Sequence, residues 1–283
     1  MEKWMVAAKR ADFKKIGERF GIDQVTARII RNRDVIGEEA IEKYLHGSRK
    51  DFYSPWLLKD MEKAVAILQE KITNKNKIRI IGDYDIDGVM STYILLVSLR
   101  GLGADADMVI PNRIMDGYGI NEHLIEQAWE DKRDTIITCD NGIAAATQIQ
   151  KAKDLGMTVI VTDHHEVPFE ENENGRTEIL PPADAVVNPK QKDCGYPFSG
   201  LCGAVVAMKV MEALYEKMAP EVDLVDRMLS FAGIATIGDV MDLKDENRIL
   251  VKEGLQRLHH TTNLGLQEPV SYTHLTLTTN SRV

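Results

Sequence analysis

Acidic side chains and imidazoles gather in three short runs of this 283-residue sequence. The first run is Gly82-Asp83-Tyr84-Asp85-Ile86-Asp87-Gly88, the second is Asp140-Asn141-Gly142, and the third is Asp163-His164-His165. Each run follows a short β-branched segment, at 78–81, 135–139 or 158–162, that predicts a buried strand. Ligands collect beyond the carboxyl ends of the strands in an open parallel sheet, so we expect the three runs to share one edge.

Packing alone does not explain carboxylates brought together at one sheet edge, because they repel each other and are costly to desolvate. A divalent cation removes that repulsion. Mixed carboxylate and imidazole ligands suit Mn²⁺, with Mg²⁺ as the alternative, and Zn²⁺ is disfavoured without thiolates. The first run also matches the start of a calcium-binding EF-hand loop, but Ile94 stands where that loop needs its glutamate. The three runs together predict a metal site.

The elements that must position these runs alternate between strand and helix. Strands are predicted at 78–81, 135–139, 158–162 and 185–187, with a strand end at 108–111, and helices at 59–72, 89–99, 121–130, 143–155, 203–218 and 226–237. This alternation indicates an α/β fold, a parallel sheet flanked by helices. Short helices are predicted before it, which gives a helical amino-terminal segment over 1–55, and 169–182 is expected to be a polar surface loop.

The three runs resemble the first three motifs of the DHH phosphoesterases. Other stretches narrow the resemblance to the RecJ-type exonucleases, which are specific for single strands: 111–113 (PNR), 116–119 (DGYG), 188–190 (NPK), 196–204 (YPFSGLCGA) and 237–243 (IGDVMDL). The last stretch looks like the fourth motif, with Asp239 as a ligand, although Asp242 stands where the family often has proline. The resemblance implies a DHH phosphoesterase domain over 56–268.

The resemblance further implies hydrolysis of phosphodiester bonds with two divalent ions, Mn²⁺ or Mg²⁺, which stabilise both the attacking and the leaving oxygen. The implied metal ligands are Asp85, Asp87, Asp140, His164 and Asp239. Asp140 is the best candidate to bridge the two ions. Asp83 is assigned to the catalytic group, either as a further ligand or as a partner of the ligands.

Other residues are expected to act on the substrate. Neighbouring residues at a strand end point in opposite directions, so His164 and His165 should differ in role. We assign His164 to the metal, and His165 to contact with the scissile phosphate or to protonation of the leaving oxygen. Arg113 could hold a phosphate or form a salt bridge. Gly200 and Gly203 could present backbone N–H groups to a phosphate, or could serve only to start a helix.

Composition excludes several other classes of protein. Hydrophobic residues make up 44% of the sequence and charged residues 28%, as in an ordinary globular protein, and no apolar run is long enough to span a membrane. The first residues lack the features of a signal peptide, and three cysteines are too few for a disulfide framework. We therefore expect a cytoplasmic protein.

Charge is unevenly distributed along the chain. The net charge is −9, yet residues 1–33 carry nine basic residues against four acidic ones. This stretch predicts either a solvated helical face or a patch that meets a phosphate backbone. Single-stranded DNA is the implied partner, and a single-strand-binding protein or a helicase is a further candidate.

The expected activity is that of a 5′-to-3′ exonuclease on single-stranded DNA in recombination and repair. One alternative is a DHH phosphodiesterase that acts on short oligonucleotides or cyclic dinucleotides, and another is a fragment that binds metal without cleaving DNA. A non-catalytic scaffold of the same fold should have lost ligands, whereas all the expected ones are present. RecJ-type proteins carry further DHHA1-type and OB-fold domains that we do not expect here, and no fold is assigned to the Thr-rich residues 269–283.

Overall fold

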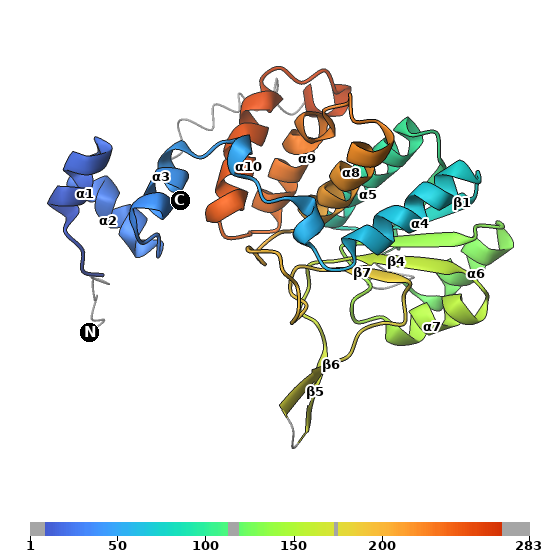
Figure 1. Ribbon diagram of the computed structural model, residues 1–283. Helices are drawn as coiled ribbons and strands as arrows, with labels where there is room; N and C mark the ends of the chain where they lie inside the picture. Colours follow the sequence, from blue (N-terminus) through green and yellow to red (C-terminus); the bar gives the residue numbers. More distant parts are fainter. Residues whose placement is uncertain (1–8, 113–118, 173–174, 268–283) are drawn as a thin grey trace.

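The centre of the molecule is a five-stranded parallel sheet with the strand order β2-β1-β3-β4-β7 (Figure 1). The computed structural model describes residues 9–112, 119–172 and 175–267. The strands are β1 (Lys77–Ile81), β2 (Asp105–Val109), β3 (Thr135–Cys139), β4 (Thr158–Thr162) and β7 (Ala185–Val187). The predicted fold class, an α/β parallel sheet flanked by helices, is confirmed.

Helices cover both faces of this sheet (Figure 1). One face carries α4 (Met61–Thr73), α5 (Ile86–Gly101) and α8 (Gly203–Met218), with α9 (Leu224–Gly238) packed on α5 and α8. The other face carries α6 (Glu122–Glu130) and α7 (Ala146–Asp154). Alternate strand residues point to opposite faces, so Ile80 and Ile137 join the first core cluster while Ile81 and Ile136 join the second. Burial on both faces explains why the strands read as continuous apolar runs.

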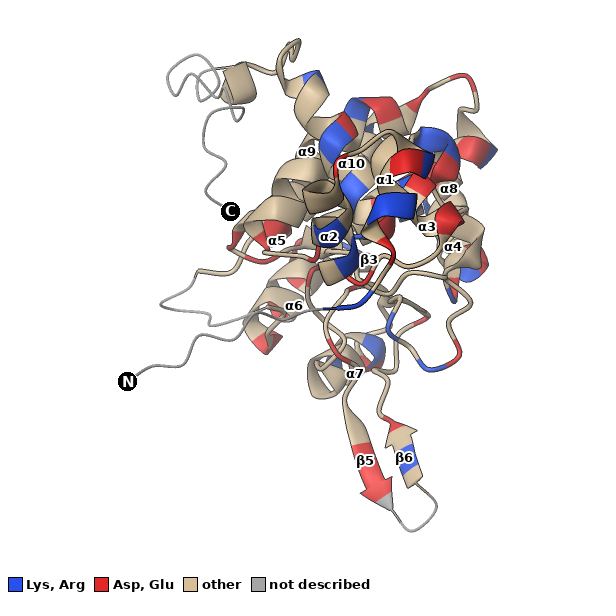
Figure 2. Ribbon diagram, turned by 90° about the vertical axis from the view of Figure 1, so that its left-hand side faces the viewer, with Lys and Arg blue, Asp and Glu red and all other residues tan. Residues whose placement is uncertain are grey.

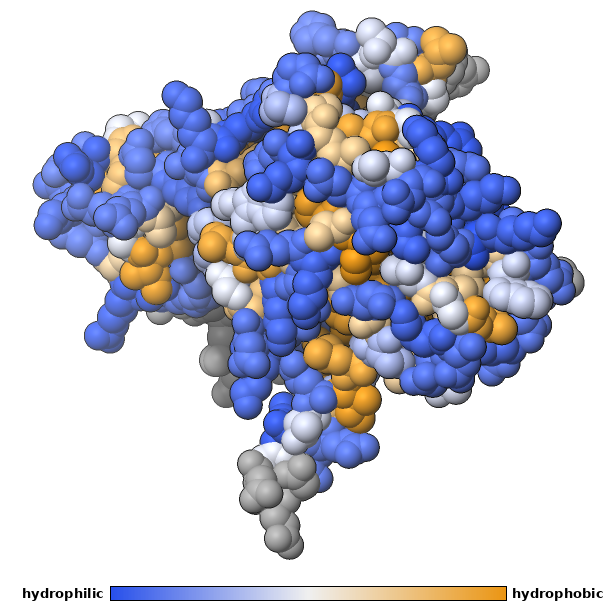
Figure 3. All heavy atoms as spheres, turned by 45° about the vertical axis from the view of Figure 1, so that its right-hand side comes forward, coloured by the Kyte–Doolittle hydropathy of each residue, from blue (hydrophilic) through white to orange (hydrophobic). Residues whose placement is uncertain are grey.

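One predicted loop contains a hairpin. The strands β5 (Phe169–Asn172) and β6 (Gly175–Glu178) pair antiparallel and project from the body (Figure 1). The polar segment 169–182 lies at the surface, as predicted, but the hairpin within it was not predicted, because the residues of β6 are polar and largely exposed and no apolar alternation marks them as a strand. Figure 3 shows a mostly hydrophilic face with apolar surface near the root of this hairpin, where Phe169, Ile179 and Leu180 are exposed.

A helical amino-terminal segment precedes the sheet, as predicted. It consists of α1 (Phe13–Phe20), α2 (Gln24–Asn32) and α3 (Glu38–His46), followed by the short 3₁₀ turns η1 (Arg49–Asp51) and η2 (Pro55–Leu57). This segment is attached to α10 (Asp245–Leu258), because Lys43 Nζ lies 2.5 Å from Asp245 Oδ1 and Arg248 Nε donates to the Tyr44 carbonyl at 2.9 Å. A boundary at residue 55 stays a prediction.

Basic residues of the amino-terminal segment lie among acidic ones (Figure 2). Lys9 pairs with Asp34 at 2.5 Å, Lys14 with Glu18 at 3.9 Å, and Arg19 with Glu38 at 3.5 Å. These pairs are mostly solvent-exposed, and such pairs contribute little to stability. The local positive charge is therefore partly offset within the segment itself.

A buried charge network joins α8 to α10. The Lys209 side chain is fully buried, and its Nζ lies 2.9 Å from Glu246 Oε1 and donates to the Tyr53 carbonyl at 2.8 Å. The other Glu246 oxygen accepts from the Tyr196 hydroxyl at 2.5 Å. Buried charges are costly unless they are paired and hydrogen-bonded. The network consequently fixes the Tyr196 segment, which leads into α8.

The described part of the chain bears on the predictions about membrane spans and disulfides. No helix there combines the length and apolarity needed to cross a membrane. Cys139, Cys194 and Cys202 are all free thiols, and the first and last are buried in the core.

Candidate metal centre

Five elements, three strands and two helices, deliver side chains to one edge of the sheet. The chain leaves β1 toward β2 on one side and later adds β3 on the other, which opens a crevice beyond the carboxyl ends of these strands. Asp83 and Asp85 follow β1, Asp140 follows β3, and His164 follows β4. Two helices complete the set, since Asp87 lies in the first turn of α5 and Asp239 is the C-cap of α9.

His164 lies at the centre of the cluster. Its Nε2 atom is 3.1 Å from Asp140 Oδ1, 3.4 Å from Asp87 Oδ2 and 3.6 Å from Asp239 Oδ2. Its side chain is only 8% exposed. One imidazole nitrogen thus faces three carboxylates from three different elements. This is the arrangement expected of groups that share a cation.

Three overlapping groups of the described residues could each hold a metal ion, with all ligand atoms of a group within 4.8 Å of one another. They are Asp83-Asp85-Asp140, Asp87-His164-Asp239 and Asp140-His164-His165. The first two groups share no residue, so they are two separate sets of candidate ligands. Asp140 belongs to two of the three groups, which suits the bridging position predicted for it.

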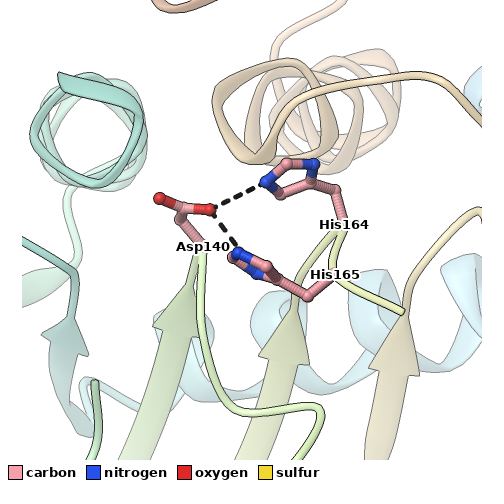
Figure 4. A group of neighbouring side chains, drawn as sticks. All are labelled: Asp140, His164 and His165. Atoms are coloured by element: carbon pink, nitrogen blue, oxygen red, sulfur yellow. Dashed lines mark ion pairs between the residues drawn. The ribbon is translucent and has the colours of Figure 1, made fainter. Parts of the chain in front are cut away.

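The second histidine lies beside the first. Figure 4 shows both imidazoles directed at Asp140, with His165 Nδ1 3.9 Å from Asp140 Oδ1 and the two ring centres 4.6 Å apart. The expectation that the two side chains point in opposite directions was wrong, because both follow the end of β4 and strand alternation does not extend to them. They differ in exposure instead, since the His165 side chain is 46% exposed.

Electrostatics favour a cation at this edge. Burial, together with the neighbouring Asp87 and Asp85 carboxylates, raises the pKa of Asp140 to about 11. Burial and Asp87 likewise raise the pKa of Asp239, while burial lowers the pKa of His164. Without added positive charge the cluster holds neutral imidazole and resists ionised carboxylates. A divalent ion would supply that charge, so the residues fit the Mn²⁺ or Mg²⁺ that the sequence predicts.

The start of α8 holds one carboxylate in place. The backbone N–H of Gly203 donates to Asp87 Oδ2 at 2.6 Å, and that of Ala204 donates to Asp87 Oδ1 at 2.8 Å. A Cβ at Gly203 would approach the Asp140 Cβ to 2.8 Å, so a glycine allows this close contact. The Gly203 N–H, for which we weighed contact with a substrate phosphate against a simple helix start, is thus bonded to Asp87, and Gly203 is the first residue of α8.

The two other predicted substrate residues have different outcomes. Gly200 lies in the loop before α8, where its carbonyl accepts from Asn247 Nδ2 at 2.7 Å. The substrate-binding role of Gly200 stays a prediction. Arg113 lies outside the described residues.

Three polar residues to which sequence reasoning assigned no role of their own support the cluster. Asp163 is buried, and its Oδ1 accepts from His165 Nδ1 at 2.8 Å and from the His164 backbone N–H at 2.7 Å. Asn141 donates to the Ile81 and Cys139 carbonyls at 3.1 and 2.9 Å, which ties β1 to the end of β3. Asn247 bridges the loops before α8 and after α9 through Gly200 and the Asp242 carbonyl. The position of Asp163 beside the two histidines was the one available signal.

Comparison with known proteins begins with a family model. Residues 77–236 match the model described as the DHH family, N-terminal domain. Single-stranded-DNA-specific exonuclease RecJ of Bacillus subtilis (strain 168) is 39% identical over 267 residues, which cover 94% of this chain and 32% of that protein. The RecJ of Escherichia coli (strain K12) is 33% identical over 242 residues, 82% of this chain and 40% of that protein. The chain thus spans between a third and two fifths of these relatives.

Solved structures of RecJ proteins are also similar to this chain. A crystal structure of exonuclease RecJ bound to manganese superposes with a TM-score of 0.68 at 33% identity, covering 77% of this chain and 53% of that one. RecJ of Thermus thermophilus in complex with Mn²⁺ gives a TM-score of 0.71 at 28% identity, covering 92% of this chain and 35% of that one.

Proposed function

Since the chain belongs to the DHH family and its DHH domain is RecJ-like, we propose that it hydrolyses phosphodiester bonds of single-stranded DNA from the 5′ end. The observation that carries this proposal is the convergence of carboxylates on His164 Nε2 at the carboxyl edge of the sheet. The names of the relatives would not support this proposal by themselves, because the chain covers only part of the length of these proteins.

The proposed metal ligands are Asp85, Asp87, Asp140, His164 and Asp239, with Asp83 beside them as a further ligand or as a partner of the ligands. Bound Mn²⁺ or Mg²⁺ ions would stabilise the charges that develop on the attacking and leaving oxygens. Asp87 is held by two backbone N–H groups, so it keeps its orientation without metal. This arrangement supports a preorganised centre rather than one assembled by the ion.

His165 is the proposed proton donor to the leaving oxygen. The hydrogen bond from His165 to Asp163 raises the pKa of His165, which favours the protonated ring. Asp163 accepts from Nδ1, and Nε2 lies on the other side of the ring, where we place the substrate. The same pair of residues would orient the ring toward a phosphate at the cluster.

The test uses the purified chain, Mn²⁺ and a 5′-phosphorylated single strand, with release of mononucleotides as the readout. The parent chain should release them, and Asp140→Asn should not. Asp154→Asn is the matched control, because Asp154 is an exposed aspartate at the far end of α7. A 3′-labelled and a 5′-labelled strand compared in parallel report the direction of digestion.

Other outcomes would contradict the proposal at different levels. Release by Asp140→Asn at the rate of the parent would exclude this cluster as the catalytic centre. Cleavage of dinucleotides or cyclic dinucleotides without cleavage of long strands would favour the alternative substrate class. No cleavage of any of these substrates, together with a Mn²⁺-dependent rise in melting temperature, would indicate a chain that binds metal without catalysis.

A further inference from the structure

A cavity of about 320 Å³ lies beside the metal cluster. Its walls come from the turn after β3, the start of α7 and the segment before α6, and include Ile120, Ile143, Ala144, Gln148 and His165. The volume is at the small end of the roughly 300–1,000 Å³ found for small-molecule sites. The cavity therefore suits a group about the size of one nucleoside.

The cavity is formed by fixed backbone. The Asn141 side chain accepts from the Ile120 N–H at 3.2 Å, and the Ile143 N–H donates to Asp163 Oδ2 at 2.9 Å. Gly142 adopts φ +108°, and a Cβ there would approach Thr138 Oγ1 to 2.5 Å. These contacts shape the walls without any ligand, as expected of a site that is already formed before binding.

His165 connects the cavity to the cluster. The residue lines the cavity, while its Nδ1 lies 3.9 Å from Asp140 Oδ1 in the cluster. A phosphate at the cluster and a group in the cavity would therefore contact the same imidazole from two sides. The cavity and the cluster thus share His165 as a common wall.

The lining determines which group fits. Ile120, Ile143 and Ala144 present apolar surface. Four lining residues carry amides or carboxylates, but Asn141 and Asp163 already accept from backbone N–H groups, and Glu166 pairs with Lys190 at 3.0 Å, which leaves Gln148. Such a lining suits the faces of a sugar and a base and provides little to distinguish one base edge from another. We propose that this cavity receives the deoxyribose and base of a nucleotide whose phosphate lies at the metal centre. The proposal rests on the proposed function and adds a subsite to it.

The test compares two phosphate ligands of different size in the presence of Mn²⁺. Calorimetric titration of the full chain with 5′-dAMP and with methyl phosphate separates binding of the nucleoside from binding of the phosphate. The parent should bind 5′-dAMP at least tenfold more tightly than methyl phosphate, and 5′-dTMP to within about threefold of 5′-dAMP.

A substitution that fills the cavity should remove this preference. Ala144 is exposed and lines the cavity, so Ala144→Trp adds bulk there without disturbing the core. The variant should bind 5′-dAMP and methyl phosphate with affinities that agree within about threefold, and its affinity for methyl phosphate should equal that of the parent. Thr147→Trp is the matched control, because Thr147 is exposed three residues further along, in the first turn of α7, and does not line the cavity.

Each other result overturns the subsite. Equal affinity of the parent for both ligands excludes it, and so does an unchanged preference in Ala144→Trp. Failure to bind 5′-dAMP in a chain that still digests single strands excludes the subsite and leaves the proposed function intact. Failure to bind Mn²⁺, either phosphate or a single strand removes both proposals.

Discussion

Asp140 holds its position with a left-handed backbone. Its φ is +61°, a conformation that aspartate and asparagine adopt more readily than most residues. The side chain also lies in a cluster that raises its pKa. Asparagine is therefore the substitution that removes the charge and keeps the backbone, and it separates electrostatics from strain.

In a metal chelator, Asp140→Asn should be more stable than the parent, by about 1 kcal/mol or more at pH 8. The folded protein raises the pKa of Asp140 above its unfolded value of about 3.9. The folded state therefore retains a proton that the unfolded state releases, and the stability of the parent falls as the pH rises through this range. Urea denaturation at pH 5.5 and pH 8 should show the advantage of the variant growing with pH. An advantage that shrinks with pH would contradict the raised pKa.

His165→Ala should lower turnover by about 10²–10⁴-fold, the range for loss of a general acid, with little change in Mn²⁺ affinity. The physical reason is that the His165 side chain is half-exposed at the edge of the cluster, whereas His164 is buried at its centre. Steady-state kinetics and Mn²⁺ titration by melting temperature measure the two effects separately. His259→Ala, at an exposed histidine after α10, is the control. Equal losses of turnover and affinity would make His165 a ligand instead.

At the scale of the elements, the buried pair of Lys209 and Glu246 joins α8 to α10. Lys209→Met should destabilise the fold by about 3–5 kcal/mol, because it leaves Glu246 buried without its cation. Urea denaturation of the single variants Lys209→Met and Glu246→Gln and of their double variant measures the coupling. The double variant should be less destabilised than the sum of the two single variants. An additive result would mean that the pair is not coupled.

Strand elements could be predicted from the sequence wherever both faces are buried. The predicted segments 135–139, 158–162 and 185–187 coincide with β3, β4 and β7, because each is a short, mostly β-branched run. At the sheet edge the same reasoning identified only the end of a strand, at 108–111, whereas β2 begins at the polar residue Asp105 and ends at Val109. The hairpin of β5 and β6 was not predicted for a related reason. Strands that pair without becoming buried need no apolar pattern, so the sequence does not indicate them.

The candidate site was predictable to the extent that strand ends mark it. Asp83, Asp140 and His164 follow predicted strands, and the parallel sheet brings them together. Asp239 lies at the end of a helix, and only the family resemblance pointed to it. The bridge that Asn247 makes between two loops depends on how α10 packs, which no local pattern of residues reveals.

At the scale of the whole molecule, the path of a bound DNA single strand can be tested through the surface charges. Charge reversal at Lys14, Lys15 and Arg19 should weaken binding of single-stranded DNA and reduce the slope of log affinity against log salt by up to about 2, at about 0.7 for each phosphate contact. The ion pairs of Lys14 and Arg19 reduce the expected change, because part of their charge is already offset. Fluorescence anisotropy at several salt concentrations gives the slope.

The matched control reverses three exposed lysines elsewhere, Lys63, Lys77 and Lys132. It changes the net charge of the molecule by the same amount and should leave the slope within error of the parent. Equal slopes for both triple variants and the parent would make the amino-terminal segment a solvated surface.

The two backbone hydrogen bonds that hold Asp87 also affect which metal ions the centre can accept. Both oxygens of this carboxylate accept backbone hydrogen bonds at the start of α8. The carboxylate is therefore not free to rotate and bind a large ion through both oxygens. Ca²⁺ prefers six to eight oxygen ligands at about 2.3–2.6 Å in a flexible shell, whereas Mg²⁺ requires a smaller and more regular one. We therefore expect a centre with one immobile carboxylate and an imidazole to favour the smaller ion. Abundant calcium would compete poorly for it.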